Sequence, residues 1–379
     1  KNMHFIVSSS VLLKNLQLVG GIISSNVILP ILEDFLFDLD NQTLTLTGSD
    51  LETMIKVKLE VQVDGDAGQN KGRICVPSKI LLEYLKNLPE QPVKFNINTQ
   101  DQTLEISSNT GKYKIGGQKA DEYPKEPVAD DTGSVTIPSK VLQDAIASTI
   151  YATSTDTLRP AMTGVYFELG QDQTTFVATD AQRLVKLTRN DVKSGFERGF
   201  IVPRKPLQQL KNIIPSDDTA LEILFNNSHL FVKNEKLSLS CRLIDAKFPP
   251  YKSVIPQENP FFLIINRADL ISCLRRVSIF ASKGSSQVVF SIVGNTVNIS
   301  AQDADFSYEG KEELTCQYQG EDMKIAFNGK LLIEMLSNLV SEEVKLELST
   351  PSRAGIYRPV NGDPNEDLLQ LLMPLIVGV

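Results

Sequence analysis

The sequence predicts an α+β fold of three repeated domains, each made of two halves that run strand, helix and three strands. Three observations support this prediction. One helix-opening motif recurs about 125 residues apart, strand-like alternation fills most of the chain between six expected helices, and prolines mark three helix starts. A chain built from three similar domains is more typical of a scaffold than of an enzyme with one pocket.

A lysine-containing motif opens one helix in each third of the chain. It reads Val-Pro-Ser-Lys-Ile-Leu-Leu at 76–82, Val-Pro-Arg-Lys-Pro-Leu at 202–207 and Phe-Asn-Gly-Lys-Leu-Leu-Ile at 327–333. Leu81, Leu207 and Leu332 fall in register. A second marker repeats as Thr-Gly-Ser-Asp at 47–50, Ala-Thr-Asp at 178–180 and Ala-Gln-Asp at 301–303.

The expected elements follow in order along the chain. Six helices are expected at about 8–19, 77–88, 138–149, 203–214, 267–280 and 328–340. Pro77, Pro138 and Pro203 are expected at the first helical position. Alternation with a period of two predicts strands, among them 44–47, 55–61, 93–97 and 104–106.

Two stretches have the composition of linkers. Residues 118–134 are rich in acid, proline and glycine, and residues 245–260 contain four prolines. They place the domain boundaries near 125 and 255. The expected domains are therefore 1–125, 126–255 and 256–379.

Composition excludes several classes of protein. No apolar run reaches the ~18–20 residues that cross a bilayer, and the start of the chain lacks a signal-peptide pattern, so a soluble cytoplasmic protein is expected. Cys75, Cys241, Cys273 and Cys316 have no zinc-type spacing and are expected to be buried free thiols. His4 and His229 are the only histidines, so neither a metal site nor a histidine-dependent catalytic centre is expected.

The distribution of charge is more informative than its sum. The chain has a net charge of −8, yet the expected helices are basic as a group and the acid is concentrated elsewhere. On a helical wheel, Leu81 and Leu85 lie on one side of the second helix and Lys79 and Lys86 on another. A basic surface for phosphates is one interpretation, and an ordinary solvated helix face is the other.

Seven segments in order carry a resemblance to a known family. They are Leu-Pro-Ile-Leu at 29–32, Leu-Thr-Gly-Ser-Asp-Leu-Glu at 46–52, Ala-Thr-Asp-Ala-Gln-Arg-Leu at 178–184, Ile-Val-Pro-Arg-Lys at 201–205, Lys-Phe-Pro-Pro-Tyr at 247–251, Phe-Asn at 327–328 and Met-Pro-Leu at 373–375. With them the chain resembles the bacterial sliding clamp, the β subunit of the replicative DNA polymerase III holoenzyme, over almost its whole length.

The resemblance implies a processivity factor for DNA replication with no catalytic site and no cofactor. It implies a head-to-tail homodimer that closes a six-domain ring, with helices lining the hole and sheets outside. The ring would encircle double-stranded DNA without reading its sequence and would be associated with the nucleoid. The residues expected to face DNA are Lys14, Lys79, Lys86, Lys140, Arg204, Lys205, Lys211, Arg275, Arg276 and Lys330.

The resemblance also implies a hydrophobic groove between the second and third domains. This groove would bind short peptide motifs of the replicative polymerase, the clamp loader and repair proteins, with Arg183 and Asn328 holding polar atoms of the peptide. Its expected residues are Met162, Thr179, Ala181, Gln182, Arg183, Leu184, Pro249, Val254, Asn328, Leu331, Met373, Pro374 and Leu375. The dimer contact would place Tyr113 and Ile115 against Ile279 and Phe280 at paired edge strands.

The chain departs from the family pattern at four places. They are Asn26, Arg159-Pro160-Ala161, the polar stretch Tyr357 to Asp367 that looks like an insertion, and Gly378-Val379 at the end. Two other classes of function stay open. One is an enzyme that holds a divalent ion on Asp303 and Asp305, or on Asp38 and Asp40. The other is a protein-interaction scaffold that does not encircle DNA.

Overall fold

The structure is a computed structural model, and it describes residues 2–25, 28–63, 70–130 and 133–377. The chain forms two compact units, each described here by itself. The first unit contains Lys1–Gln143 and Lys205–Leu243, and the second contains Asp144–Arg204 and Ile244–Val379. Neither unit is a continuous stretch of chain.

The element order confirms the predicted sixfold repeat of strand, helix and three strands. The first third contains β1 (Asn2–Ser8), α1 (Ser9–Gly20), β2 (Asp34–Asp40), β3 (Thr43–Ser49), β4 (Thr53–Glu60), β5 (Lys71–Pro77), α2 (Ser78–Lys86), β6 (Pro92–Asn98), β7 (Thr103–Ser107) and β8 (Lys112–Gly116). The middle third contains β9 (Gly133–Pro138), α3 (Ser139–Thr149), β10 (Gly164–Leu169), β11 (Thr174–Thr179), β12 (Arg183–Arg189), β13 (Arg198–Pro203), α4 (Arg204–Ile213), β14 (Ala220–Phe225), β15 (His229–Lys233) and β16 (Leu237–Arg242).

The last third adds one short strand to the same pattern. It contains β17 (Phe261–Asn266), α5 (Arg267–Val277), β18 (Gln287–Val293), β19 (Thr296–Asp303), β20 (Tyr308–Thr315), β21 (Gln317–Gln319), β22 (Met323–Asn328), α6 (Gly329–Ser337), β23 (Glu343–Leu348), β24 (Gly355–Pro359) and β25 (Glu366–Leu372). Four 3₁₀ turns matter for the site: η4 (Ile150–Ala152), η5 (Pro160–Met162), η6 (Tyr251–Val254) and η7 (Ser278–Phe280).

The two halves of each third exchange their first strands. The first unit has a four-stranded sheet in the order β1-β6-β7-β8 and an eight-stranded sheet in the order β5-β2-β3-β4-β16-β15-β14-β9. The second unit has a nine-stranded sheet in the order β13-β10-β11-β12-β25-β24-β23-β17-β21 and a four-stranded sheet in the order β20-β19-β18-β22. Because β1 pairs with β6 while β5 pairs with β2, neither half completes a sheet alone.

Sheets also continue from one third of the chain into the next. β4 pairs with β16 in the first unit, with Val57 opposite Leu237. β12 pairs with β25 in the second unit, with Arg183 opposite Leu372. The middle third therefore contributes four strands to each unit. This is why the boundary between the two units lies within the middle third.

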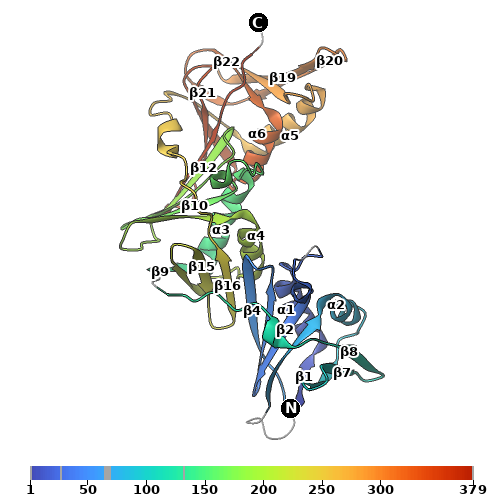
Figure 1. Ribbon diagram of the computed structural model, residues 1–379. Coiled ribbons are helices and arrows are strands. Elements are labelled where there is room, and N and C mark those ends of the chain that lie inside the picture. The colour runs from blue at the N-terminus through green and yellow to red at the C-terminus, as the bar shows by residue number, and fades with distance from the viewer. Residues whose placement is uncertain (1, 26–27, 64–69, 131–132, 378–379) are drawn as a thin grey trace. The chain divides into compact units, whose positions relative to one another are not determined.

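The repeated lysine motif has the predicted amphipathic orientation. Leu81, Leu207 and Leu332 are all completely buried. The lysines two residues before them, at 79, 205 and 330, are all exposed. Within the units, α1 packs beside α2, and α5 packs beside α6 (Figure 1).

The prolines expected at the first helical position end the preceding strands instead. Pro77, Pro138 and Pro203 are the last residues of β5, β9 and β13, and each helix begins at the next residue. A proline has no N–H to donate to a ladder, so it fits the end of a strand as well as the start of a helix.

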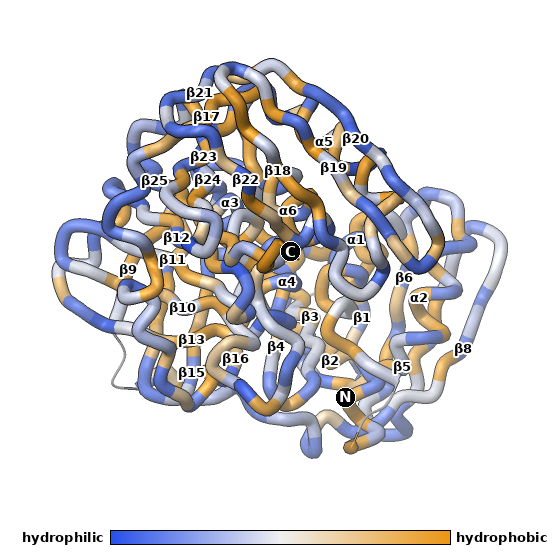
Figure 2. The backbone as a smooth tube through the Cα atoms, turned by 90° about the horizontal axis from the view of Figure 1, so that it is seen from above, coloured by the Kyte–Doolittle hydropathy of each residue, from blue (hydrophilic) through white to orange (hydrophobic). Residues whose placement is uncertain are grey.

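Most strands alternate buried and exposed residues as predicted, for example β1 and β6. β20 differs, because its sequence is largely polar (Figure 2). Its side chains are exposed or half-buried. It is the first strand in the order of its sheet, so one of its edges has no neighbour. β8 ends the order of its own sheet in the same way.

Candidate functional sites

The second repeated marker forms the same turn in the first two thirds of the chain and a different turn in the last third. The Oδ1 atoms of Asp50 and Asp180 each accept from backbone N–H groups two and three residues later, at 2.7–3.1 Å. Asp303 Oδ1 accepts from the N–H two residues later at 3.1 Å. Leu51 and Ala181 follow the first two aspartates at φ +77° and +76°, a conformation that these turns impose.

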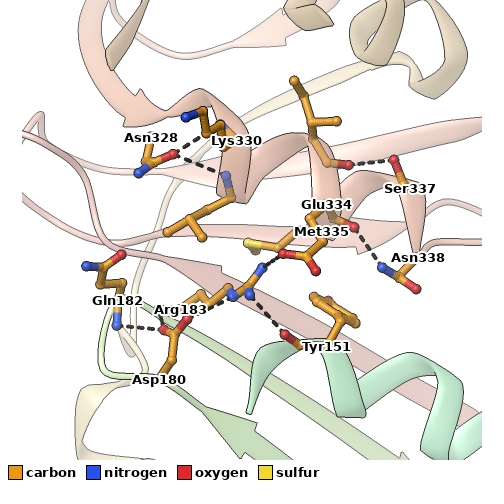
Figure 3. Close-up of polar contacts among 12 residues, drawn as sticks. Tyr151, Asp180, Gln182, Arg183, Asn328, Lys330, Glu334, Met335, Ser337 and Asn338 are labelled. Carbon is orange, nitrogen blue, oxygen red and sulfur yellow. Dashed lines mark hydrogen bonds and ion pairs between the residues drawn. The ribbon is translucent and has the colours of Figure 1, made fainter. Parts of the chain in front are cut away.

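Arg183 lies directly after the second of these turns and holds three elements together (Figure 3). Its Nε donates to Asp180 Oδ2 at 3.1 Å, its Nη1 to Glu334 Oε2 at 2.6 Å and its Nη2 to the carbonyl of Tyr151 at 2.9 Å. The residue is only 6% exposed. The chain itself therefore holds this side chain in place, and its expected contact with a peptide stays a prediction.

A second layer of buried polar contacts lies next to Arg183. The side-chain amide of Gln370, fully buried on β25, donates to the hydroxyl of Tyr151 at 2.7 Å and to the carbonyl of Met335 at 2.8 Å. Burial raises the pKa of Tyr151 well above its usual value, so its hydroxyl stays protonated. The turn, η4, α6 and β25 are thus joined by charged and neutral hydrogen bonds.

Asn328 is the N-cap of α6. Its Oδ1 accepts from the N–H groups of Lys330 at 3.0 Å and Leu331 at 3.2 Å. This is the usual arrangement of an N-cap asparagine. The Oδ1 atom is therefore engaged within the chain, and the expected contact of Asn328 with a peptide stays a prediction. Leu331 beside it is half-buried.

The C-terminal segment runs beside this network. The N–H of Met373 donates to the carbonyl of Gln182 at 2.9 Å, and the N–H of Leu375 donates to the carbonyl of Ala326 at 2.8 Å. Pro374 and Leu375 are half-buried, whereas Met373 is 44% exposed. The segment therefore joins the turn before β12 to β22 and leaves the apolar side chains of Met373 and Ile376 exposed to solvent.

A buried apolar cluster forms a floor near these residues. Its members are Val177, Leu184, Ile201, Phe248, Tyr251, Ala354, Ile356, Leu369 and Leu371, with Ala161 packed against it. Thr179 and Leu184 are 7% and 2% exposed, so both belong to the floor or its support. Val254, at the end of η6, is 54% exposed. Met162 follows Ala161 in η5, and Pro249 follows Phe248, so these two predicted groove residues are next in the chain to residues of the cluster.

The expected DNA-facing cations lie on all six helices. Eight of them are exposed and two are half-buried, Arg204 and Lys211. Lys205 Nζ lies 2.7 Å from Asp50 Oδ2, and Arg276 makes two contacts to Glu312, at 2.6 and 2.7 Å. These hydrogen bonds lower the pKa of Glu312. The contact with Glu312 holds Arg276 against β20. The sequence did not indicate this contact, because the two residues are 36 positions apart.

The stretch expected as an insertion is mostly a hairpin of the nine-stranded sheet. Its first residues belong to β24 and its last to β25, so only 360–365 form a loop. Arg189 of β12 holds this loop, with 2.9 Å from Nη1 to Asp363 Oδ2 and 3.3 Å to Glu366 Oε2. Two other departures, Asn26 and Gly378-Val379, lie outside the described residues. In the fourth, Arg159 donates from Nε to Asp156 Oδ2 at 2.9 Å.

The four residues expected at a dimer contact have different surroundings. Tyr113 on β8 is 46% exposed, but Ile115 is only 8% exposed and already belongs to the core of its own chain. Ile279 and Phe280 are 73% and 39% exposed and lie in η7 rather than in an edge strand. The structure therefore leaves three of the four available for a partner.

One of the two candidate metal pairs has ion-pair partners within the chain. Asp40 lies 2.8 Å from Lys71, and Asp38 lies 3.5 Å from Arg73. Among the described residues, no group of three or more metal-ligating side chains is found. All four cysteines are free and buried, as predicted. No described helix has the length and apolar character needed to span a bilayer.

Comparisons with known proteins cover the whole chain. Three profiles match in order: the N-terminal domain of the DNA polymerase III beta subunit at 3–127, its central domain at 136–250 and its C-terminal domain at 252–376. The beta sliding clamp of Halalkalibacterium halodurans is 28% identical over 383 residues, covering 98% of this chain and 99% of that protein. That of Staphylococcus epidermidis is 28% identical over 379 residues, with the same coverage.

Solved structures show the same likeness. The DNA polymerase sliding clamp of Bacillus subtilis superposes with a TM-score of 0.90 at 25% identity, covering 100% of both chains. The Pseudomonas aeruginosa sliding clamp bound to griselimycin superposes with a TM-score of 0.92 at 24% identity, again over 100% of both chains. The second likeness bears on the fold alone.

Proposed function

We propose that this chain, which belongs to the DNA polymerase III beta subunit family and is a DNA polymerase processivity factor, acts as a dimeric ring that encloses duplex DNA and tethers a polymerase. The observation that carries the proposal is the hydrogen bond from the Met373 segment to the Gln182 turn, beside strands β12 and β25, whose Leu184 and Leu371 belong to the buried apolar cluster. We propose no catalytic step for the chain and no cofactor. We also keep the division into domains 1–125, 126–255 and 256–379 as a proposal, supported by the sixfold element repeat.

The groove fits a short peptide with large apolar side chains. Met373 has a flexible, partly exposed side chain and Val254 is exposed, so both can pack against a ligand without a change in the surrounding fold. Arg183 and Asn328 act indirectly, since they fix the turn and the start of α6 that border the groove. Two or three apolar anchors at about 1.5–3 kcal/mol each suit partners that must exchange, because ordering costs offset part of this energy.

A double substitution tests the groove. Met373→Ala with Leu375→Ala should abolish stimulation of a cognate polymerase and leave the mass of the assembly unchanged. The matched control is Val293→Ala, which shortens an exposed apolar side chain on β18. Normal stimulation by the double variant would refute the groove assignment.

The exposed helix cations support a sliding contact with DNA. They would attract phosphates without reading bases, and the attraction weakens with salt by ~0.9 log units per phosphate neutralised. The competing proposal, a scaffold that does not encircle DNA, shares the groove but not this contact. Loading onto nicked circular DNA separates them, because an enclosing ring is retained on the circle and slides off after linearisation.

Two unpaired strand edges support the dimer contact. β8 carries Tyr113 at one end of its sheet, and β20 lies beside Ile279 and Phe280 at an end of another. A head-to-tail contact would cover both edges and repeat until the ring closes. Ile279→Asp should give a monomer in sedimentation at micromolar concentration. An unchanged dimer mass would remove this joint from the proposal.

A further inference from the structure

A carboxylate on β10 holds the short turn that carries Val254. Glu168 accepts from two consecutive residues of η6: the hydroxyl of Tyr251 donates to Oε2, and Lys252 Nζ donates to Oε1 at 2.9 Å. Both carboxylate oxygens are therefore engaged by the same turn. Glu168 is half-buried and Tyr251 is 6% exposed, so the contact lies at the edge of the core.

Glu168 is ionised at neutral pH. Burial opposes its charge, but the hydrogen bonds from Lys252 and Tyr251 outweigh burial and leave the pKa of Glu168 below its usual value. Burial and then the hydrogen bond to Glu168 raise the pKa of Tyr251, so the tyrosine keeps its proton and is the donor. Hydrogen bonds to an ionised group are stronger than those between neutral groups. Glu168 therefore makes two strong, directional contacts to η6.

The other contacts of η6 are local or apolar. The N–H and the hydroxyl of Ser253 both donate to the carbonyl of Pro250 within the turn, at 3.1 and 2.7 Å. The rings of Phe248 and Tyr251 meet edge to face, and Phe248 stacks on Tyr166 of β10 with centroids 4.7 Å apart. Apolar packing is not directional. Within the described part of the chain, Glu168 is the side chain that bonds this turn to the sheet.

The linker of the first unit shows that a buried tyrosine does not require such a carboxylate. Tyr123 is 3% exposed and packs in a cluster with Ala120 and Met54. Its hydroxyl lies 3.5 Å from the carbonyl of Thr47, which is a weak contact. Burial of a linker tyrosine is thus possible with a weak backbone contact alone. The two contacts of Glu168 are an addition in the second unit.

The position of η6 determines where Val254 lies. Tyr251 belongs to the buried apolar cluster, and Ile255 packs against it, so the cluster holds the chain on both sides of Val254. The same cluster contains Leu184 and Leu371, which lie opposite each other in β12 and β25. The side chain of Val254 is nevertheless 54% exposed. A contact that fixes η6 therefore also fixes an exposed apolar side chain beside this cluster.

We infer that Glu168 is a positioning residue for the proposed peptide groove and holds η6 in place before a partner binds. This inference rests on the groove proposed above and adds a residue outside the expected groove set. A site whose binding conformation is only partly populated loses affinity in proportion to that population. Loss of the Glu168 contacts should therefore slow association, whereas loss of a direct contact acts mainly on dissociation.

The test measures the binding rates of the cognate polymerase by surface plasmon resonance. Glu168→Ala should lower the association rate at least fivefold and change the dissociation rate less than twofold. Glu168→Gln keeps an acceptor for Tyr251 and should recover part of this loss. The matched control is Glu222→Ala, which removes a strand glutamate paired with Lys233 at 3.4 Å in the first unit and should change both rates less than twofold.

Hydrogen exchange shows whether the effect is local. Exchange at the N–H of Ser253 should quicken in Glu168→Ala, while exchange at the N–H of Met373, which donates to Gln182, stays unchanged. Tyr251→Phe removes only the hydroxyl and should slow association in the same way, so it serves as the test if Glu168→Ala fails to fold.

The outcomes separate this inference from the groove proposal. If the Glu168 and Tyr251 variants keep normal rates while Met373→Ala with Leu375→Ala abolishes binding, the positioning role is wrong and the groove stands. If none of these variants weakens binding, the groove fails and the inference fails with it. If Glu168→Ala changes only the dissociation rate, Glu168 contacts the partner directly and the positioning role is overturned.

Discussion

Replacing Arg183 by methionine removes a buried guanidinium while keeping most of the side chain's length. The carboxylate of Asp180, 18% exposed, and the carbonyl of Tyr151 then lose their charged donor. Removing one partner of a buried ion pair costs about 3–5 kcal/mol. Glu334 is 48% exposed, so its share lies nearer the 0–1 kcal/mol typical of surface pairs. We expect Arg183→Met to lower the unfolding free energy of the second unit by about 3 kcal/mol, and Glu334→Gln by less than about 1 kcal/mol.

The assay must resolve one unit from the other, because a chain with two contact units need not unfold in a single step. Hydrogen exchange at the N–H of Met373, which donates to Gln182, reports directly on the turn that Arg183 anchors. Exchange there should quicken in Arg183→Met and stay unchanged in the exposed-cation control Lys79→Met. If Arg183→Met and Glu334→Gln lower the free energy of unfolding in urea equally, the reasoning is refuted, because it predicts a larger loss for the buried Arg183 than for the half-exposed Glu334.

Three further predictions concern pH, thiols and salt. Burial and then the charge of Glu33 raise the pKa of Asp34 to about 6. The folded chain therefore binds this proton more tightly than the unfolded chain, and its stability falls as the pH rises from about 4 to about 6. Asp34→Asn should remove this pH dependence of the urea midpoint and stabilise the chain at pH 7 by about 2 kcal/mol. The four buried cysteines, for example Cys241 with its pKa raised to about 12 by burial, should resist a thiol reagent in native buffer and all react in denaturant, and rapid native labelling would contradict their burial. Lys79→Glu with Lys86→Glu should lower the salt slope of DNA binding by about two units, and an unchanged slope would place α2 away from DNA.

The sequence was sufficient for features that depend on neighbouring residues. Helical periodicity identified Leu81 and Leu332 as buried and Lys79 as exposed, because these orientations follow from 3.6 residues per turn. The exchange of first strands could not be predicted in this way. Whether β1 pairs with β6 or with β2 depends on the packing of both halves together, and both choices present the same alternation.

The groove residues were predicted as a group, but not their individual roles. Arg183 was expected to hold polar atoms of a peptide. Its acceptor Asp180 is three residues away, but two others are distant in sequence: Tyr151 lies 32 residues away and Glu334 lies 151 away. Likewise Leu184 was expected to line the groove, yet β12 is buried on both faces for most of its length. Burial on the second face comes from elements distant in sequence, so a period of two does not reveal it.

The position of Arg183 would allow the proposed groove to bind a peptide with little ordering cost. Arg183 and Leu372 are directly opposite in the ladder between β12 and β25, and Met373 is the next residue after that ladder ends. Its backbone is still held by Gln182, in the turn that Asp180 and Arg183 fix. The exposed side chain of Met373 is therefore flexible on a backbone that is already fixed. Binding energy gained there is not spent on ordering the main chain, so a short peptide with few anchors can be held.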